Sequence, residues 1–534
     1  MRWLTITVIL VACAGPAGAQ EASRDEIART IASGVDYLVS EQQPDGSWGP
    51  VGGKRDVEGG LPVAKAAMVT LALLHANLPQ SAEATNRGFS WVTQHAPERC
   101  TYSAGAVMSM LFRHGHPERH DKLIDEYLYR LIVSQKTRGV QAGSWGYWLV
   151  AWGPRSRTRV EPLDWDAVSN RSDHSNMQFA VLALHYARRS GYQVPEKTWK
   201  RVLEYYTANQ DQDGGWGYYG NPYRRSLGNP PGPSTPNMTI ASTISVYLVE
   251  EALGSAGHHQ CRAPETSRVY EAGVNWIAAH WNDRLSTYGW YAIERLGILT
   301  GRSNFGTHDW YEEGARDLIR RRTEWTVDQG DRVCSTALAV LFLARGLEPV
   351  IINKLQRTGD WNNDPYDVQH LVEHISHRFQ KPVQWRIVTL EAPMSTLLRT
   401  PILYMNGHEG LVFTETEKTK LRDYVNRGGC LYGQACCDRK EFDASFRALA
   451  AELFPGSKFE ALPKTHEVYT SPKRLVAKPA LEVVQVGQDG RPAVLYSPHD
   501  LCCRWNNASA RAETALDLGA NITFYLRKHS PLGK

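Results

Sequence analysis

The sequence predicts a multidomain protein in which an all-α (α/α)6 toroid, residues 20–346, precedes an α/β three-layer sandwich, residues 385–534. The first two-thirds of the chain alternates amphipathic helical patterns with almost wholly apolar ones. The last third alternates short apolar runs with helices, which is typical of a layered α/β domain. A length of 534 residues also exceeds what one hydrophobic core usually holds, so at least two domains are expected.

The helices of the first two-thirds form six consecutive pairs. In each pair the first helix is amphipathic and the second is nearly all apolar or small, as in AGAVMSMLF and QFAVLALHYA. A helix that is apolar all round is buried on every side. Six buried helices, each antiparallel to an amphipathic one, most simply give two concentric rings. The predicted pairs are 25–42 with 62–76, 82–95 with 103–114, 121–135 with 174–190, 196–209 with 237–254, 267–282 with 287–299, and 309–326 with 333–345.

Three of the amphipathic helices are followed by Gln, a tight turn with Gly, and Trp-Gly. The stretches are SEQQPDGSWGP (40–50), SQKTRGVQAGSWGYW (134–148) and NQDQDGGWGYYG (209–220). We expect Gln42, Gln135 and Gln210 to donate to orphan carbonyls at the helix ends. Gly permits positive φ in the turn, and each Trp should cover helix ends with a large apolar area. These tryptophans are therefore interpreted as structural.

The Q-x-x-D-G-S/G-W pattern on paired helices resembles the QW motif, or squalene cyclase repeat, of the terpene cyclase and prenyltransferase superfamily, over residues 25–345. The resemblance implies a terpenoid cyclase-like toroid. Class II cyclases protonate their substrate with an Asp of a D-x-D-D-T-A motif, and the nearest match is DHSNMQFA, residues 173–180. Asp173 matches the first Asp, but Ser175 replaces the proton donor and Asn176 the last Asp. The cyclase reaction is therefore not expected.

Neither a metal nor a cofactor is expected in the toroid. The chain contains no D-D-x-x-D sequence for Mg²⁺ and pyrophosphate, and Asp331 and Cys334 depart from the D-x-C zinc ligands of protein prenyltransferases. Complement-type thioester domains also use a toroid, but their C-G-E-Q sequence is missing. On this interpretation the toroid keeps the fold of its family without the chemistry.

Two long loops of the predicted toroid, residues 143–172 and 216–237, are rich in aromatic residues and arginine. Loops on a rigid scaffold often carry binding sites, and aromatic faces with Arg suit a carbohydrate or an isoprenoid bearing a phosphate. Alternatively, Asp173 or Ser175 caps the helix that follows, and the loops form a lid. The candidate ligand-binding residues are Asp173, His174, Asn176, Gln178, Trp148, Arg157 and Tyr219.

The last third of the chain follows residues 347–384, which are interpreted as a linker with a connecting helix. Thr414 and Glu417 form a predicted capping box, and Asp489-Gly490 marks a hairpin turn. The alternation of strands and helices indicates the three-layer sandwich. The predicted strands are 385–390, 400–406, 429–437 and a hairpin over 481–498, and the predicted helices are 415–427, 440–454 and 511–527.

Three stretches of this part resemble a domain family of unknown function with a Rossmann-like, class I glutamine amidotransferase-like fold. They are YVNRGGCLYGQACCDRKEFDASFRALAAELFP, ALPKTHEVY and LYSPHDLCCRW. Proteins that join this domain to QW repeats are exported bacterial proteins with no assigned reaction. The resemblance therefore implies a fold for nearly the whole mature chain but confers no activity.

Two pairs of adjacent cysteines follow predicted strands of this domain. Cys436 and Cys437 end a strand and precede a helix, whose dipole would lower a thiol pKa. His499 and Asp500 follow a later strand and could serve as base and orienting group. The Gly-x-Cys-x-Gly elbow and the His-x-Glu pattern of amidotransferases are absent, and a disulfide from the first cysteine pair to the pair at 502–503 is the competing interpretation. A zinc site is not expected, because adjacent cysteines do not fit the usual C-x₂₋₄-C chelate.

The first residues of the chain predict export. Arg2, the apolar stretch 4–14 and a small-x-small cleavage site fit a signal peptide over 1–19. A lipid anchor at Cys13 is the alternative. We expect a periplasmic or extracellular location and no transmembrane segment, because no later stretch has roughly 20 apolar residues. A net charge of +4 without Lys/Arg runs argues against nucleic acid as a partner.

Three functions fit these observations. The favoured one is an exported ligand-binding or assembly protein of the cell envelope, which binds a small molecule (an isoprenoid or a carbohydrate) or other envelope proteins. The first alternative is a Cys-dependent hydrolase or transferase in the carboxy-terminal domain. The second is an isoprenoid- or glycan-processing enzyme at the toroid mouth. Whether the chain is an enzyme stays open at this point.

Overall fold

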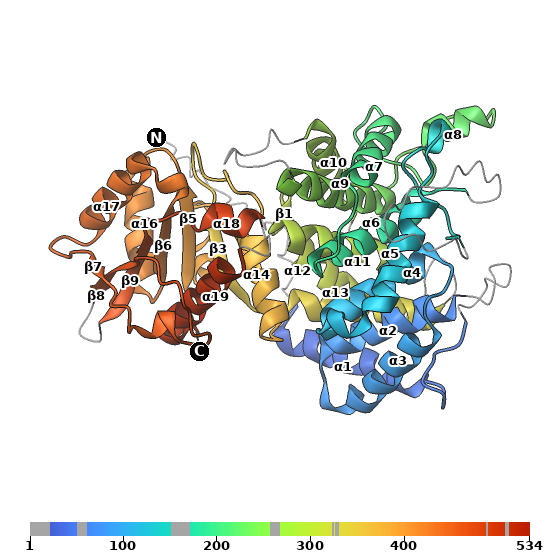
Figure 1. Cartoon of the computed structure of the whole chain (residues 1–534), viewed down its shortest axis with the longest axis horizontal. Coiled ribbons are helices and arrows are strands. Elements are labelled where there is room, and N and C mark those ends of the chain that lie inside the picture. Colours follow the sequence, from blue (N-terminus) through green and yellow to red (C-terminus); the bar gives the residue numbers. More distant parts are fainter. Residues whose placement is uncertain are drawn as a thin grey trace, which may run out of the picture.

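The computed structural model of the chain places a helical region beside a region that contains a β-sheet (Figure 1). It describes residues 22–50, 61–150, 171–256, 267–282, 284–322, 325, 331–486, 490–507 and 512–533. The N-terminal region is 58% helical and the C-terminal region holds a mixed sheet of seven strands, which confirms the prediction of two regions of different class. The expected signal peptide over 1–19, with Cys13, and the candidate residue Arg157 lie outside the described residues. Within the described part, no helix combines the length and the apolar character needed to cross a membrane.

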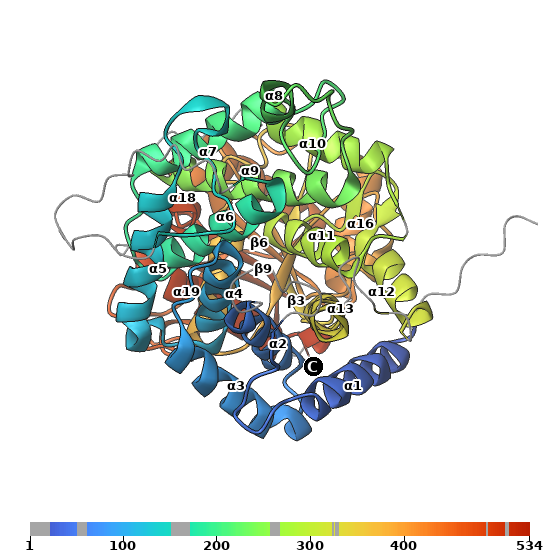
Figure 2. The same cartoon turned by 90° about the vertical axis from the view of Figure 1, so that its right-hand side faces the viewer.

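Six helices of the N-terminal region pack in a closed ring (Figure 2). Each contacts the next one in chain order, and the last contacts the first. They are α2 (Pro62–Ala76), α4 (Thr101–His114), α6 (His174–Arg189), α9 (Pro236–Ala256), α11 (Thr287–Thr300) and α13 (Arg332–Gly346). These are the helices that the sequence predicts as buried, and all start within two residues of their predicted positions.

The amphipathic helices pack on the outside of this ring, α1 against α13, α3 against α2, and α7 and α10 against α9. They are α1 (Arg24–Ser40), α3 (Ala82–His95), α5 (Asp121–Ser134), α7 (Glu196–Asn209), α10 (Arg268–Ala279) and α12 (Trp310–Arg320). The last two end earlier than predicted. Short elements in the connections are η2 (Pro79–Ser81), η3 (Pro117–His120), η4 (Gly139–Gln141), α8 (Asn221–Ser226), β1 (Asn304–Phe305) and β2 (His308–Asp309).

The repeated Gln-turn-Trp motif joins neighbouring repeats through hydrogen bonds. Each indole N–H donates to one of the last four carbonyls of the preceding outer helix: Trp48 to Leu38 (2.7 Å), Trp145 to Leu131 (2.7 Å) and Trp216 to Tyr206 (3.1 Å). The Gln side chain instead bridges the turn to the next outer helix. Gln135 Nε2, for example, donates to the carbonyls of Gly143 (3.2 Å) and Thr198 (3.0 Å). The free carbonyls at the helix ends therefore accept hydrogen bonds from Trp and not from Gln as expected. The turn folds the indole back over the helix end.

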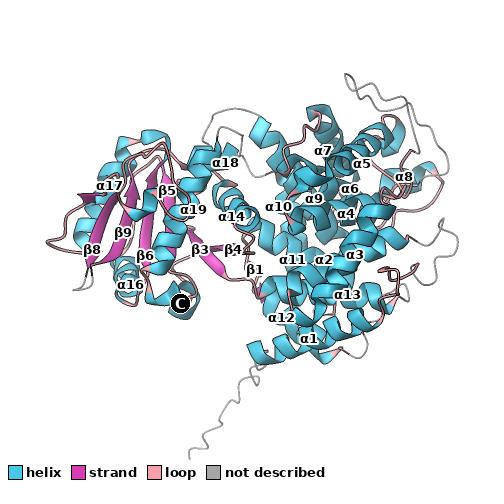
Figure 3. Cartoon of the chain, turned by 60° about the horizontal axis from the view of Figure 1, so that its bottom comes forward, coloured by secondary structure: helices cyan, strands magenta, loops and turns pink. Residues whose placement is uncertain are grey.

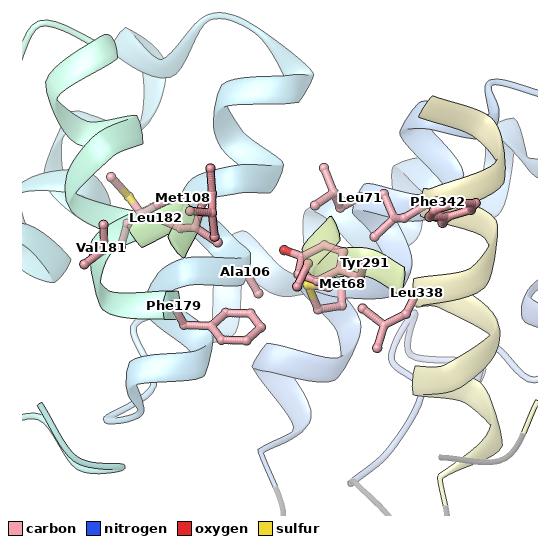
Figure 4. Packing of buried hydrophobic residues seen from close by; sticks show 14 of the residues in the cluster. Met68, Leu71, Ala106, Met108, Phe179, Val181, Leu182, Tyr291, Leu338 and Phe342 are labelled. Carbon is pink, nitrogen blue, oxygen red and sulfur yellow. The ribbon is translucent and has the colours of Figure 1, made fainter. Parts of the chain in front are cut away.

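A single apolar cluster fills the space between the helices and includes residues from all six helices of the inner ring. Figure 4 shows Met68 and Leu71 of α2, Phe179 of α6, Tyr291 of α11 and Leu338 of α13 among its members. Each inner helix packs against two inner neighbours and an outer helix. Its sequence is therefore apolar on every side.

The C-terminal sheet has the strand order β4-β3-β5-β6-β9-β8-β7. The first five strands in this order are parallel, and β8 and β7 continue the sheet antiparallel. The strands are β3 (Val350–Leu355), β4 (Gln384–Val388), β5 (Ile402–Gly407), β6 (Cys430–Ala435), β7 (Glu460–Ala461), β8 (Glu482–Val486) and β9 (Arg491–Ser497). The carboxyl ends of the five parallel strands therefore meet at one edge of the sheet.

Helices cover both faces of this sheet (Figure 3), each over its own apolar cluster. One face is covered by α14 (Asp367–Arg378), α18 (Cys502–Asn507) and α19 (Glu513–Lys528). The other is covered by α15 (Met394–Leu397), α16 (Glu415–Asn426) and α17 (Lys440–Leu453). The predicted capping box of Thr414 and Glu417 is present at the start of α16. Short 3-10 helices are η5 (Cys436–Asp438), η6 (Glu467–Tyr469) and η8 (Pro531–Gly533).

Residues 347–384, expected as a linker with a connecting helix, contribute β3 and α14 to this region. The strand was not anticipated because its sequence, VIINKL, contains two polar residues that are nevertheless buried. Asn353 Nδ2 donates to the carbonyl of Leu397 (3.2 Å), and Lys354 Nζ donates to Asp367 Oδ1 (2.6 Å). These bonds satisfy polar groups that would otherwise be costly in a core.

The two regions meet along β4, the edge strand of the sheet. The backbone N–H of Ile387 donates to the carbonyl of Gly301, at the end of α11, at 2.8 Å. The Trp385 ring packs on the same glycine, where an added Cβ would lie 2.7 Å from the ring. Gly301 has φ of +68°, so both its conformation and the close approach of Trp385 favour glycine.

A buried ion cluster also joins α14 to the inner ring. Glu251 of α9 pairs with Arg188 of α6 at 2.6 Å and with His370 of α14 at 3.0 Å. Burial favours the neutral form of Glu251, but the charge of Arg188 and hydrogen bonds from two histidines together lower its pKa well below the usual range. The ionised carboxylate thus ties the sheet-containing region to the ring.

Candidate functional site

The candidate ligand residues of the helical region cluster at the start of α6. Asp173 is the N-cap, and its two carboxylate oxygens accept from the backbone N–H and the side-chain amide of Asn176, both at 2.8 Å. The capping interpretation of Asp173 is confirmed. Because both oxygens bond within one turn, this carboxylate stabilises the helix start.

A chain of hydroxyl groups and an amide crosses this place. Tyr102 Oη donates to Ser175 Oγ at 2.7 Å, Ser175 Oγ donates to Tyr288 Oη at 3.2 Å, and Tyr288 Oη donates to Gln178 Oε1 at 2.6 Å. Ser175 stands where the resemblance to cyclases places the proton donor. The position therefore holds a serine hydroxyl fixed by two tyrosines.

His174 is buried and neutral. Its Nδ1 bonds the carbonyl of Gly217 at 2.6 Å, and burial lowers the pKa of His174 to about 4. Its Nε2, Asn176 Oδ1 and Gln178 Nε2 are buried and find no hydrogen-bond partner among the described residues. Buried polar atoms of this kind are rare, and these three would suit the polar groups of a ligand.

Two candidate ligand-binding residues from the predicted loops, Tyr219 and Trp148, lie near the inner ring. Tyr219 packs edge-on against Tyr218 with ring centroids 4.9 Å apart, and the Tyr218 carbonyl accepts from the backbone N–H of His174 at 3.1 Å. Trp148 forms an isolated bridge with Cys100 beside the start of α4. The loops around residues 148 and 219 therefore both approach the inner ring.

The carboxyl edge of the parallel strands gathers thiols, carboxylates and a histidine. Parallel α/β sheets commonly bind ligands at this edge. Asp364 comes from the connection after β3, His408 follows β5, Cys436 and Cys437 follow β6, and Asp500, Cys502 and Cys503 follow β9. The thiol cluster is defined as Asp364, Cys436, Cys502 and Cys503, whose donor atoms all lie within 4.8 Å of one another.

The cysteines of the thiol cluster come from the two predicted pairs, but no disulfide joins these pairs. Cys436 Sγ lies 3.2 Å from Asp364 Oδ2 and 3.6 Å from Cys503 Sγ, well beyond the roughly 2.05 Å of a disulfide. Cys503 is disulfide-bonded, whereas Cys436 and Cys502 are free thiols. The strand ends therefore meet as expected, without the expected cross-link.

The thiol cluster concentrates groups that can carry negative charge. Burial raises the pKa of Asp364 to about 7 and that of Cys502 well above its usual range. For Cys436 a hydrogen bond with Cys502 favours the thiolate, but burial and the charge of Asp364 outweigh it and raise the pKa. Lys354 donates to the Asp364 backbone carbonyl at 2.7 Å while its charge pairs with Asp367. No described lysine or arginine forms an ion pair with the Asp364 carboxylate.

Cys437 borders the thiol cluster in a left-handed backbone conformation, with φ 52° and ψ 31°. Its neighbour Asp438 has φ 54°. Such conformations are costly for residues other than glycine and recur at active sites. A ring nitrogen of His408 and the sulfurs of Cys436 and Cys437 lie within 4.8 Å of one another. His408 Nδ1 is 3.3 Å from Asp360 Oδ2, and burial raises the pKa of the Cys437 thiol to about 12.

The predicted base and orienting group lie at the rim of this site. His499 Nδ1 is 3.9 Å from Asp438 Oδ1, and both side chains are more than half exposed. Asp500 Oδ1 accepts from the backbone N–H of Cys503 at 3.0 Å and from Cys502 Sγ at 3.4 Å. No hydrogen bond within the described residues joins His499 to a cysteine.

Sequence reasoning missed His408, the histidine nearest the cysteines of β6. A usable signal existed, because His408 follows the predicted strand 400–406 almost directly. The end of that strand had to lie at the same edge as the end of the strand predicted over 429–437. Asp364 could not be found in this way, because β3, the strand that precedes it, was not predicted.

Comparison with known proteins identifies the C-terminal region. The family described as Domain of unknown function (DUF4159) matches residues 351–526, so this region contains a DUF4159 domain that begins within β3. Among solved structures, the chain shows weak similarity to a type II terpene cyclase from Scytonema, determined in complex with geranylgeranyl dihydroxybenzoate. The identity is 12%, the TM-score 0.36, and the match covers 60% of this chain and 97% of that one. No curated protein matches the chain.

Proposed function

We propose that the chain is an exported envelope protein whose helical region, an (α/α)6 toroid, serves as a scaffold. Its C-terminal domain, an amidotransferase-like three-layer sandwich, then carries the functional centre, a zinc site of the kind that activates water. On this proposal the C-terminal domain starts at residue 347, because β3 and α14 belong to the same sheet and cover. The proposal departs from the sequence-based expectation of no metal.

The proposed scaffold role is supported by the residues that stand in place of the cyclase motif. Asp173 caps α6, and Ser175 lies in a chain of hydroxyl groups between two tyrosines. Neither arrangement supplies a strong acid to a substrate. The unpartnered atoms of His174, Asn176 and Gln178 favour a polar ligand, such as a carbohydrate, at this place.

The thiol cluster is the observation that carries the zinc proposal. In a tetrahedral zinc site, with bonds of about 2.3 Å to sulfur and 2.0–2.2 Å to oxygen, ligand atoms lie roughly 3.5–3.8 Å apart. Cys436 Sγ is 3.2 Å from Asp364 Oδ2 and 3.6 Å from Cys503 Sγ, and Cys503 Sγ is 3.8 Å from Asp364 Oδ2. Cys436 and Asp364 therefore already have nearly the spacing that the metal requires, and the donor atom of Cys502 lies within 4.8 Å of both. Cys503 has a similar spacing and would become a fourth donor only if its disulfide were reduced.

The oxidation state of Cys503 decides the type of zinc site. With Cys503 in a disulfide, three protein donors remain, from Asp364, Cys436 and Cys502, and the fourth position is open to water. Three protein ligands plus water is the arrangement of catalytic zinc, whereas four protein ligands make a structural site. His408, which lies beside Asp360 and within 4.8 Å of the Cys436 sulfur, would be the group to accept a proton from such a water.

Metal analysis tests the proposal. Protein purified from its exported location without chelator should contain about one zinc per chain by plasma mass spectrometry. Asp364→Asn, which keeps the size of the side chain, and Cys436→Ser should bind zinc more than about 100-fold more weakly, because loss of a direct ligand exceeds a second-shell effect. Cys334→Ser, in α13 of the ring, is the matched control. Zinc content that stays the same in Cys436→Ser, with circular dichroism unchanged, would overturn the proposal.

A second candidate, a Cys-dependent hydrolase or transferase, is favoured by the left-handed backbone at Cys437 and by the nearby His408–Asp360 pair. In this case His408 would accept the Cys437 proton. Iodoacetamide labelling of Cys437, measured after chelation, separates the possible bases. His408→Gln should slow the labelling and His499→Gln should not. The reverse result would favour the pair predicted from sequence, and no change in either variant would remove the candidate.

A further inference from the structure

A cavity of about 380 Å³ lies where the two regions meet, away from the thiol cluster. Its lining comes from the start of α1, from α12, from the connection 346–350 and from the C-terminal domain. Four of the lining side chains are arginines: Arg24, Arg386, Arg399 and Arg527. We name it the arginine cavity. Its volume is within the range of about 300–1,000 Å³ typical of small-molecule sites.

The charges that line the arginine cavity do not balance. The lining includes two carboxylic acids, Glu312 and Glu348. Glu348 pairs with His75 at 2.9 Å, and burial raises its pKa to about 7, so it offers little negative charge. Within the described residues, none of the four guanidinium groups forms an ion pair or a side-chain hydrogen bond. Glu312 offsets one of the four positive charges, so a surplus of positive charge lines the cavity.

Two of the four guanidinium groups are partly removed from water, which favours the binding of an anion. Burial lowers the pKa of Arg386, and the charge of Arg399 lowers it further. The carboxylates of Asp309 and Glu312 oppose this shift in part. Burial also lowers the pKa of Arg527. Arg386 and Arg527 are half-buried, whereas the other two arginines of the cavity are exposed. Partial loss of hydration at the two half-buried guanidinium groups costs free energy that a bound anion would offset.

The chemistry of the walls indicates the class of ligand. Guanidinium groups bind the oxygens of phosphates and carboxylates in pairs, with good geometry for both hydrogen bonds. Leu347, Pro349 and Pro401 add apolar surface to the same walls. We propose that the arginine cavity binds a small organic oxyanion carrying two or more negative charges, either phosphate or carboxylate groups. Because the arginines come from both regions, the ligand would also strengthen their contact.

Titration calorimetry on the full-length mature chain tests this site. Pyrophosphate and citrate serve as probes for the phosphate and the carboxylate form, at constant ionic strength set with sodium chloride because screening weakens such contacts. At least one probe should bind with Kd below about 1 mM. Arg386→Gln and Arg399→Gln should each weaken binding by about tenfold or more. Arg474→Gln, an exposed arginine of the same domain, should leave binding unchanged.

The outcomes separate the possible ligands and can refute the site. Tighter binding of pyrophosphate indicates a phosphate ligand, and tighter binding of citrate indicates a polycarboxylate. Arg399 is exposed, so its substitution should fold normally and keeps the test valid if Arg386→Gln does not. No binding of either probe, or equal binding by Arg399→Gln and Arg474→Gln, overturns the inference. Binding should persist in Cys436→Ser, which makes a failure here distinguishable from a failure of the zinc proposal.

Discussion

The link between neighbouring repeats depends on a buried glutamine, and replacing it should loosen the helical region by a measurable amount. Gln135 has no exposed surface, and its side-chain amide donates to the carbonyls of Gly143 and Thr198. In Gln135→Met a side chain of similar size remains, but both donors are lost. The apolar packing is largely kept, so the change removes the two hydrogen bonds together with the buried Oε1, which has no partner among the described residues.

The expected loss of stability follows from the two carbonyls. Thr198 lies in α7, where its carbonyl keeps a helical hydrogen bond, so losing the second bond costs about 0.5–1 kcal/mol. Gly143 lies in the turn and its buried carbonyl loses its side-chain donor, which costs about 1–2 kcal/mol. The sum is about 1.5–3 kcal/mol. A helical region of this length has an unfolding entropy of about 0.7 kcal/mol per kelvin, so its Tm should fall by about 2–4 °C.

Differential scanning calorimetry of the full-length chain measures this shift, and Gln94→Met is the matched control. Gln94 is exposed on α3, and surface substitutions usually change stability by less than about 0.5 kcal/mol. A Tm for Gln135→Met that equals that of Gln94→Met would show that the bridge between repeats contributes nothing. The interpretation of the repeated motif would then be wrong.

Three further predictions follow from buried contacts. Gly297→Ala places a Cβ 2.4 Å from the Trp310 indole, and this overpacking should cost about 1–3 kcal/mol and lower Tm. Burial raises the pKa of Glu348 to about 7, above the roughly 4.3 of an unfolded chain. Stability should therefore decline as the pH rises from about 4.5 to 7, and Glu348→Gln should flatten this decline; equal slopes would contradict it. The pKa of Glu251 is lowered instead, so its contribution is present above about pH 4.3 and is lost as the pH falls further. Unfolding of Glu251→Gln should consequently depend less on pH between about 5 and 3 than that of the wild type, and a steeper dependence would contradict it.

Local patterns predicted the helical region well because its helices are defined by local chemistry. The apolar spacing of α2 and the acidic cap at Asp173 are visible within a few residues, and both are observed. The same holds for the capping box at Thr414. The bonding of Gln135 was not predictable, because its acceptor Thr198 lies 63 residues away.

Much of the C-terminal site could not be predicted, because it is formed by contacts between residues that are distant in the sequence. Lys354 made β3 look polar, and its partner Asp367 lies in the following helix. With β3 missed, Asp364 had no place at the sheet edge. The position of His408 just after a predicted strand places it at the correct sheet edge, but its nearness to Cys437 also depends on β5 and β6 being neighbours. Adjacent cysteines were recognised as notable, but the carboxylate that joins them into a metal-type cluster was not.

The contact of β4 with α11 has a consequence for how the chain is made. An uncovered sheet edge is a template for pairing with other chains, and β4 has its edge covered by the ring, where Ile387 bonds Gly301 and Trp385 packs. The ring precedes the C-terminal domain in the chain, so it emerges first, and domains generally fold in that order. The earlier-folded ring is then in place to receive β4 as soon as it emerges. A C-terminal domain expressed alone would lack this cover and should aggregate, so the order of the two regions in the gene protects the product.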